Sequence, residues 1–167
     1  MITSKRTYLR KFKAEDCELL FNLDSNSIVH EYLYNMPMKS LSEAKKYISV
    51  LLNQYDKYGL GRLIVFDKNN NFIGWAGLKY NISTINNKSN FYDLGFRLKP
   101  EYWGKGIATE VSIAILHYYK SDKKIINNIY AIASTENIAS NKVLLKSGLS
   151  LITEFSLLGK PVNWYEL

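Results

Sequence analysis

The chain has 167 residues and a hydrophobic content of 47%, which are typical of one globular domain over residues 1–167. Its formal net charge is +7. A chain of this length folds without a disulfide or metal staple, and this composition excludes a collagen, a disordered tail and a cysteine-rich secreted scaffold. One cysteine and two distant histidines do not supply a zinc site, so no metal is expected. No apolar leader follows Met1 and no stretch is long enough to span a membrane, so we expect a cytoplasmic protein with no membrane partner.

The excess of positive charge permits nucleic acid, an anionic membrane surface or a phosphorylated ligand, and does not choose among them. No recognised RNA- or DNA-binding motif is present, so a nucleic-acid partner is not expected. Basic residues crowd the N-terminal segment, where we expect them to form a solvated face. These residues are Lys5, Arg6, Arg10, Lys11 and Lys13.

Hydrophobic periodicity and turn residues predict mixed helices and strands. Helices are expected, in chain order, over 14–22, 26–34, 41–58, 108–119 and 137–146. Strands are expected over 7–12, 62–67, 72–80, 91–98, 129–133, 149–157 and 162–165. The 41–58 helix is the best marked, because Ser40 precedes Glu43 at the spacing of a capping box. Gly95 interrupts a strand, which indicates a bulge or a close approach. The class is therefore α+β or mixed α/β.

A glycine-rich turn, Gly104-Lys105-Gly106, lies between a predicted strand and a predicted helix. Glycines let a ligand approach the backbone, and unpaired N–H groups at a helix start, with the helix dipole, suit a pyrophosphate. Lys105 adds a positive charge. A dinucleotide-binding motif is not matched, because Thr109 stands where a third glycine or alanine is needed, and the P-loop pattern is absent. By itself the pattern allows an anion site or a simple turn.

Further motifs accompany this turn, and together they are spread over nearly the whole chain. They are Tyr8-Leu9-Arg10-Lys11-Phe12, Phe72-Ile73-Gly74-Trp75-Ala76-Gly77-Leu78, Asp93-Leu94-Gly95-Phe96, the stretch 100–110 around the turn, and the stretch 136–149 that begins Glu136-Asn137. In this order and spacing the sequence resembles the GNAT superfamily of N-acetyltransferases, within it the branch of ribosomal-protein N-terminal acetyltransferases. The resemblance implies a mixed, mostly antiparallel twisted sheet of about six or seven strands, flanked by helices and splayed at its central strands.

The resemblance also implies acetyl transfer from acetyl-coenzyme A (acetyl-CoA) to an amine. Backbone N–H groups from about Tyr102 to Ala108 would hold the pyrophosphate, and the backbone of Leu98 and Phe96 would bind the pantetheine arm. Glu101 stands where the family usually has Gln or Arg. The residues implied in cofactor binding are Phe96, Leu98, Tyr102, Trp103, Gly104, Lys105, Gly106, Ile107, Ala108, Asn137 and Lys142.

Catalysis needs a base for the attacking amine and a donor for the leaving thiolate. Asp93 is the first candidate for the base, with Glu31 and His30 as weaker ones. Many relatives have a tyrosine acid where this chain has Leu144, so Ser140 or solvent would take that role.

The acceptor site is expected between the helix predicted over 26–34 and the ends of the strands predicted over 72–80 and 91–98. The residues expected there are equally compatible with packing in the hydrophobic core. They are His30, Tyr32, Tyr34, Trp75 and Tyr92. The acceptor is a protein N-terminus or a small amine. The alternative function is a non-catalytic module that binds or senses acyl-CoA. A homodimer formed through sheet edges is compatible with either function.

Overall fold

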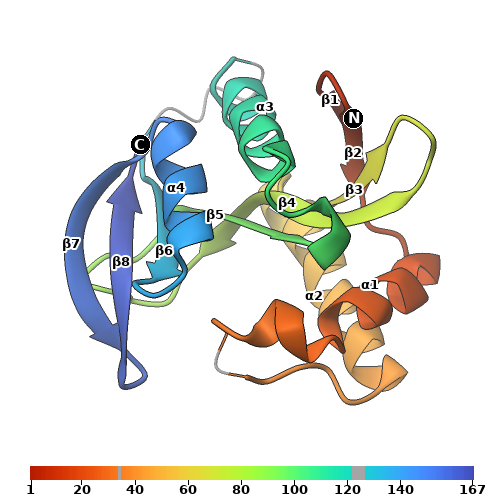
Figure 1. The fold of residues 1–167 in the computed structure, drawn as a ribbon, viewed down its shortest axis with the longest axis horizontal. Helices are drawn as coiled ribbons and strands as arrows, with labels where there is room; N and C mark the ends of the chain where they lie inside the picture. Colours follow the sequence, from red (N-terminus) through yellow and green to blue (C-terminus); the bar gives the residue numbers. More distant parts are fainter. Residues whose placement is uncertain (34, 122–126) are drawn as a thin grey trace.

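A single twisted sheet of eight strands organises the chain in the computed structural model, which describes residues 1–33, 35–121 and 127–167 (Figure 1). The strands are β1 (Ile2–Thr3), β2 (Thr7–Lys11), β3 (Arg62–Asp67), β4 (Phe72–Asn81), β5 (Phe91–Leu98), β6 (Ile129–Ser134), β7 (Ser150–Leu157) and β8 (Lys160–Glu166). Their order is β1-β2-β3-β4-β5-β6-β8-β7, and every neighbouring pair is antiparallel except β5 with β6. The mixed, mostly antiparallel fold is thus confirmed. The sheet has more strands than expected because the two-residue β1 pairs with β2.

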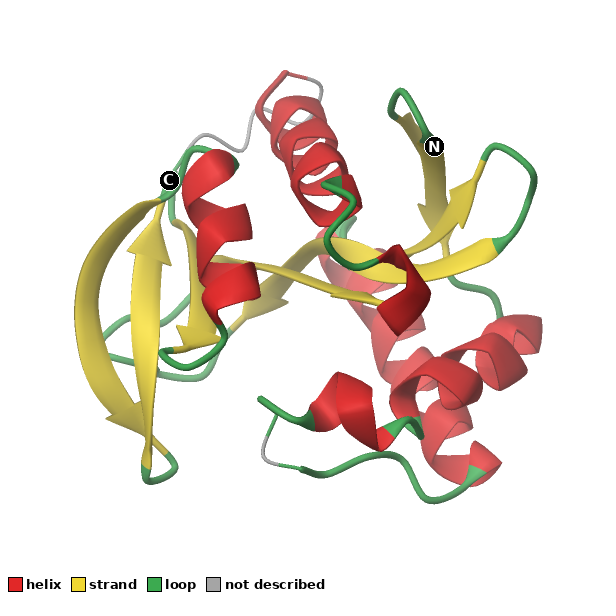
Figure 2. Cartoon of the chain, in the orientation of Figure 1, coloured by secondary structure: helices red, strands yellow, loops and turns green. Residues whose placement is uncertain are grey.

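Helices cover both faces of the sheet (Figure 2). They are α1 (Cys17–Asp24), α2 (Leu41–Tyr58), α3 (Ile107–Ser121) and α4 (Ile138–Lys146), with short 3-10 helices η1 (Ala14–Asp16), η2 (Ser27–His30) and η3 (Pro100–Tyr102). In Figure 1, α3 lies in front of the sheet and α2 passes behind it. Along the described residues, none of the helices combines the length and hydropathy that a membrane span requires.

The predicted start and end of α2 are confirmed. The Ser40 side chain accepts a hydrogen bond from the Glu43 N–H group, and Gly59 ends the helix with a φ of +70°. The helix expected over 26–34 is wrong, because only the four residues of η2 are helical. Tyr34, expected at its end, lies outside the described residues.

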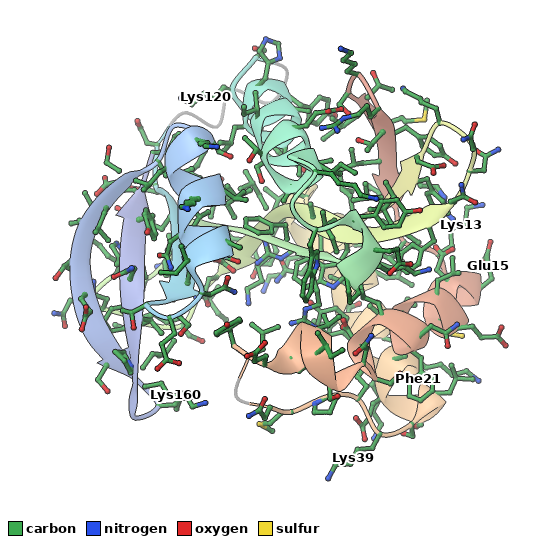
Figure 3. All side chains as sticks on the ribbon, viewed as in Figure 1. Lys13, Glu15, Phe21, Lys39, Lys120 and Lys160 are labelled. Carbon is green, nitrogen blue, oxygen red and sulfur yellow. The ribbon has the colours of Figure 1, made fainter. Side chains whose placement is uncertain are left out.

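The N-terminal basic residues form a solvated face only in part. Lys5, Lys11 and Lys13 are exposed, and Lys13 lies at the edge of the molecule (Figure 3). The two arginines of this segment instead form ion pairs. Arg10 pairs with Asp16 at 2.7 Å, and Arg6 pairs with Glu110. The arginines therefore have structural partners that the charge pattern does not predict.

The sheet opens at its centre. β5 and β6 pair only through Tyr92 with Ile129 and through Asp93 with Tyr130. Beyond these pairs the remainder of β5, to Leu98, separates from β6 within the described strands. This separation is the predicted splay, and it places a gap between the two halves of the sheet.

Candidate active site

A cavity of about 250 Å³ occupies the gap between β5, β6 and α4. Its walls come from strands β3 to β6, helix α4, the loop after β4 and the end of β7. Among the residues expected in the site, those that line the cavity are Trp75, Asp93, Phe96, Asn137 and Ser140. The structure therefore brings residues from both halves of the sheet to one hollow.

Backbone groups of β5 point into the same gap. The Tyr92 N–H group donates to the C=O group of Asn128, just before β6. The Lys99 N–H group donates to the C=O group of Ile73 in β4, on the opposite side of the strand. Peptide groups alternate between the two sides of a strand, so the N–H and C=O groups of Phe96 and Leu98 face the gap, whereas the Leu94 N–H group is used in the pairing of Asp93 with Tyr130 of β6. The edge of β5 is thus open to an extended ligand.

Two of the predicted pyrophosphate donors are already hydrogen-bonded within the chain. The N–H groups of Tyr102 and Trp103 donate to the C=O groups of Lys99 and Pro100, each at 3.0 Å, and so close the η3 turn. The Trp103 indole also donates to the Leu98 C=O group at 2.7 Å. This contact joins the end of β5 to the turn and occupies the Leu98 C=O group. The Leu98 N–H group is then the part of this peptide strand that can bind a ligand in the gap.

The glycine turn before α3 provides the donors that remain. Among the described residues, no backbone acceptor pairs with the N–H groups from Gly104 to Thr109, and the Glu110 N–H group is the first to bond, to Gly106. Gly104 and Gly106 have φ values of +71° and +73°, which favour glycine. A Cβ atom would meet nothing within 4 Å at Gly104 and only Arg6 Nη2, at 3.8 Å, at Gly106. The turn therefore combines free donors, open space and a helix N-terminus, which fit a pyrophosphate.

Asp93 lies in the cavity wall and is paired with a buried arginine. Arg62 Nη2 donates to Asp93 Oδ2 at 2.6 Å, and Arg62 Nη1 donates to the C=O groups of Asp93 and Gly77. Lys79 Nζ lies 3.9 Å from the same Oδ2 atom. Loss of hydration lowers the pKa of Lys79, and Asp93 offsets part of this shift. Gly95 makes room for the guanidinium, because a Cβ atom there would lie 2.6 Å from Arg62 Nη2.

Gly95 therefore marks a close approach and not a bulge, since it pairs regularly with Gly77. Sequence reasoning missed Arg62, and the only signal for it was a glycine inside a strand.

Helix α4 contributes a cap and an apolar wall to the cavity. Asn137 Oδ1 accepts a hydrogen bond from the Ser140 N–H group at 3.0 Å, so this oxygen caps the helix. The Nδ2 group of Asn137 is then the part of the side chain suited to a ligand. Leu144, one turn after Ser140, also lines the cavity, where it offers no hydroxyl group. Lys142 is exposed on this helix and lies outside the cavity lining.

Three residues expected at the acceptor site do not line the cavity. Tyr92 lies on the opposite face of β5 from Asp93, with its ring 5.4 Å from that of Tyr80. Tyr32 lines a separate pocket. His30 is buried with Nε2 3.3 Å from Arg97 Nη1, and burial, followed by this positive charge, lowers the pKa of His30. These placements are set by the sheet register and by η2, which periodicity alone does not reveal.

No group of three or more His, Cys, Asp or Glu side chains suited to a metal ion occurs within the described parts of the chain.

The sequence and the fold both have known relatives. The acetyltransferase (GNAT) domain family matches residues 6–150. The Bacillus subtilis protein named uncharacterized N-acetyltransferase YoaA is 29% identical over 149 residues, covering 89% of this chain and 81% of the relative. Ribosomal-protein-S5-alanine acetyltransferase from Vibrio fischeri has a similar structure, with a TM-score of 0.79, 19% identity and coverage of 99% and 94%. Spermidine N-acetyltransferase from Vibrio cholerae, solved with CoA and spermine, has a TM-score of 0.76, 21% identity and coverage of 96% and 94%. The family match spans most of the chain and includes both the turn and the gap, so the chain belongs to the GNAT acetyltransferase family.

Proposed function

We propose that this protein transfers the acetyl group of acetyl-CoA to a primary amine of a protein N-terminus or a small molecule. One observation carries the proposal: free N–H groups at the α3 turn and along β5 lead to a cavity that contains a carboxylate. A ligand with a phosphorylated end, an amide-bearing arm and a reactive tip matches this sequence of contacts.

The cofactor would lie along the gap. The N–H groups of Gly104, Lys105, Gly106, Ile107 and Ala108 would hold the pyrophosphate, with the side chains of Lys105 and Lys142 near the phosphates. The N–H group of Leu98 and the backbone of Phe96 would bind the pantetheine arm as if it were an added strand. The Nδ2 group of Asn137 would donate to the same arm.

The chemistry then takes place beside Asp93. The amine nitrogen attacks the thioester carbon, a C–N bond forms, and negative charge develops on the carbonyl oxygen. The gap-facing N–H group of Phe96 is suited to stabilise that charge. The C–S bond then breaks with its electron pair on sulfur, Asp93 Oδ1 or a water removes a proton from nitrogen, and Ser140 or solvent protonates the thiolate.

The acceptor is the open part of the proposal. Spermidine and ribosomal-protein acetyltransferases share this fold, so the fold supports either a small amine or a protein N-terminus. The resemblance of the motifs favours the ribosomal-protein branch. A cytoplasmic location and a homodimer remain predictions.

The test is an acceptor screen with acetyl-CoA over ribosomal-protein N-terminal peptides, polyamines, amino acids and aminoglycosides, with thiol release as the readout. We expect release with one acceptor class and loss of release with Gly106→Val. Asp93→Asn should lower the rate mainly below the pKa of the acceptor, and an unchanged pH profile would remove Asp93 as the base.

The second candidate function is an acyl-CoA-binding module without turnover, which the apolar Leu144 in the cavity favours. Tight CoA binding by calorimetry with no thiol release for any acceptor would support this module and overturn the enzyme.

A further inference from the structure

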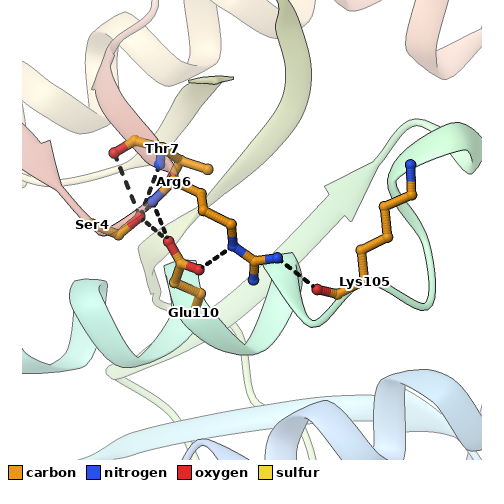
Figure 4. Close-up of polar contacts among 5 residues, drawn as sticks. All are labelled: Ser4, Arg6, Thr7, Lys105 and Glu110. Carbon is orange, nitrogen blue, oxygen red and sulfur yellow. Dashed lines mark hydrogen bonds and ion pairs between the residues drawn. The ribbon is translucent and has the colours of Figure 1, made fainter. Parts of the chain in front are cut away.

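The N-terminal turn is tied to the start of α3 by a group of polar contacts (Figure 4). Arg6 Nε donates to Glu110 Oε2 at 2.6 Å, and the Arg6 backbone N–H group donates to Glu110 Oε1 at 2.7 Å. The Ser4 hydroxyl donates to the same Oε1 atom at 2.6 Å and accepts from the Thr7 N–H group. Residues about a hundred positions apart thus form one compact network.

A further contact of this network reaches the glycine turn. Arg6 Nη1 donates to the Lys105 C=O group at 2.8 Å (Figure 4). In a trans peptide the C=O group and the following N–H group point in opposite directions, and the described chain has no cis peptide bond. Holding the Lys105 C=O group toward Arg6 therefore directs the Gly106 N–H group to the other side of the turn. A cation on the carbonyl also polarises that peptide and strengthens the N–H donor.

The contact needs an arginine that is itself held. A guanidinium has several donors in a rigid fork, so one nitrogen can bind Glu110 while another binds Lys105, which a lysine ammonium does not reproduce. Glu110 lies in the first turn of α3 and is mostly buried. Partial burial opposes its ionisation, but the hydrogen bonds from Ser4 and Arg6 hold the pKa of Glu110 below its ordinary value. The carboxylate is therefore a charged anchor for Arg6 at neutral pH.

We propose that Arg6 is a positioning residue for the pyrophosphate: anchored by Glu110, it holds the Lys105–Gly106 peptide so that the Gly106 N–H group points at the phosphates. This inference rests on the proposed acetyl-CoA site. Arg6 acts from the far side of the turn, through the peptide, and contacts no reacting atom.

The test compares Arg6→Met with Lys5→Met, which removes the same charge from an exposed neighbour in the same turn. We expect Arg6→Met to raise the Kd for CoA, measured by calorimetry, about tenfold, the value of one charge-assisted hydrogen bond. The KM for acetyl-CoA should rise by a similar factor with kcat nearly unchanged. With acetyl-pantetheine, a donor without a pyrophosphate, kcat/KM should be unchanged. Lys5→Met should match the parent in all three.

The outcomes separate the two proposals. A parent protein that does not bind CoA would overturn the proposed function. A parent that binds CoA, with equal Kd values for Arg6→Met and Lys5→Met, would overturn the role of Arg6. Equal losses with both donors would also overturn it, since a general structural defect does not distinguish the donors. If Arg6→Met does not fold, Glu110→Gln replaces it, with an expected rise in Kd of about threefold, and an unchanged Kd would again overturn the role.

Discussion

Gly95 is a position where one added methyl group should disturb the site. A Cβ atom there would lie 2.6 Å from Arg62 Nη2 and 2.8 Å from Arg62 Cζ. The Gly95 backbone is ordinary paired strand, so Gly95→Ala introduces a collision and no backbone strain. The guanidinium is held by Gly77 and Asp93 and lies 5.4 Å from the Trp75 ring, so it can move away from the added Cβ atom only by giving up these contacts.

The cost follows from what Arg62 must give up. Moving the guanidinium breaks its hydrogen bonds to Gly77 and Asp93 and leaves the Asp93 carboxylate with only the more distant Lys79 Nζ, at 3.9 Å, as a charged partner among the described residues. Overpacking costs about 1–3 kcal/mol, and breaking a buried ion pair costs about 3–5 kcal/mol. We therefore expect Gly95→Ala to lower the free energy of unfolding by about 3 kcal/mol, which for a domain of this size lowers Tm by roughly 6–12 °C.

The assay is urea and thermal unfolding of Gly95→Ala beside Gly104→Ala. Gly104 has a φ of +71° and open space around it, so alanine there carries only left-handed strain, about 1–2 kcal/mol. A stability loss at Gly95 no larger than that at Gly104 would refute the reasoning, because it would show that Arg62 moves freely. Gly95→Ala should also lower kcat, since Asp93 would lose its orientation.

Three further predictions concern the cofactor turn, helix α4 and a buried histidine. Gly106→Val should abolish detectable CoA binding in calorimetry while the protein stays folded by circular dichroism, because the side chain fills the space against the pyrophosphate and strains a φ of +73°. Asn137→Asp keeps the Oδ1 cap and loses the Nδ2 donor, so it should preserve Tm but raise the KM for acetyl-CoA about fivefold, whereas Asn137→Ala should also lower stability by about 1 kcal/mol; a normal KM in both would reduce Asn137 to a cap. Burial lowers the pKa of His30 in the folded state, so the unfolded state binds more protons below pH 6.5 and stability falls as the pH drops through that range. Urea unfolding between pH 7.5 and pH 5 should show a smaller loss for His30→Gln than for the parent, and parallel curves would contradict this assignment.

Most of the fold is predictable from local pattern. The strands over 62–67 and 91–98 match their predicted ranges, because apolar and β-branched residues bounded by turns specify buried strands. The helix over 26–34 fails because only Val29 and His30 of η2 are buried, so no apolar face stabilises further turns.

The site is predictable only where its residues are close in sequence. The glycine turn and the start of α4 are contiguous motifs, so their pattern is visible in the chain. The partners Arg62 of Asp93 and Arg6 of Lys105 come from distant segments, and their contacts depend on the sheet register and on side-chain rotamers. The N–H groups of the predicted donors Tyr102 and Trp103 are paired for a local reason, since they close the η3 turn before the glycine turn begins.

The sparse pairing of β5 with β6 divides the sheet into two parts, one formed by β1 to β5 and the other by β6, β8 and β7. Only two residue pairs join these two parts among the described strands, and the proposed reaction would take place beside them. Ile85, from the loop between β4 and β5, and Leu157, from the end of β7, both line the cavity. Substitutions in these two segments would change the cavity wall and leave the glycine turn intact, so under the proposed function the acceptor would change while the acetyl donor stays the same.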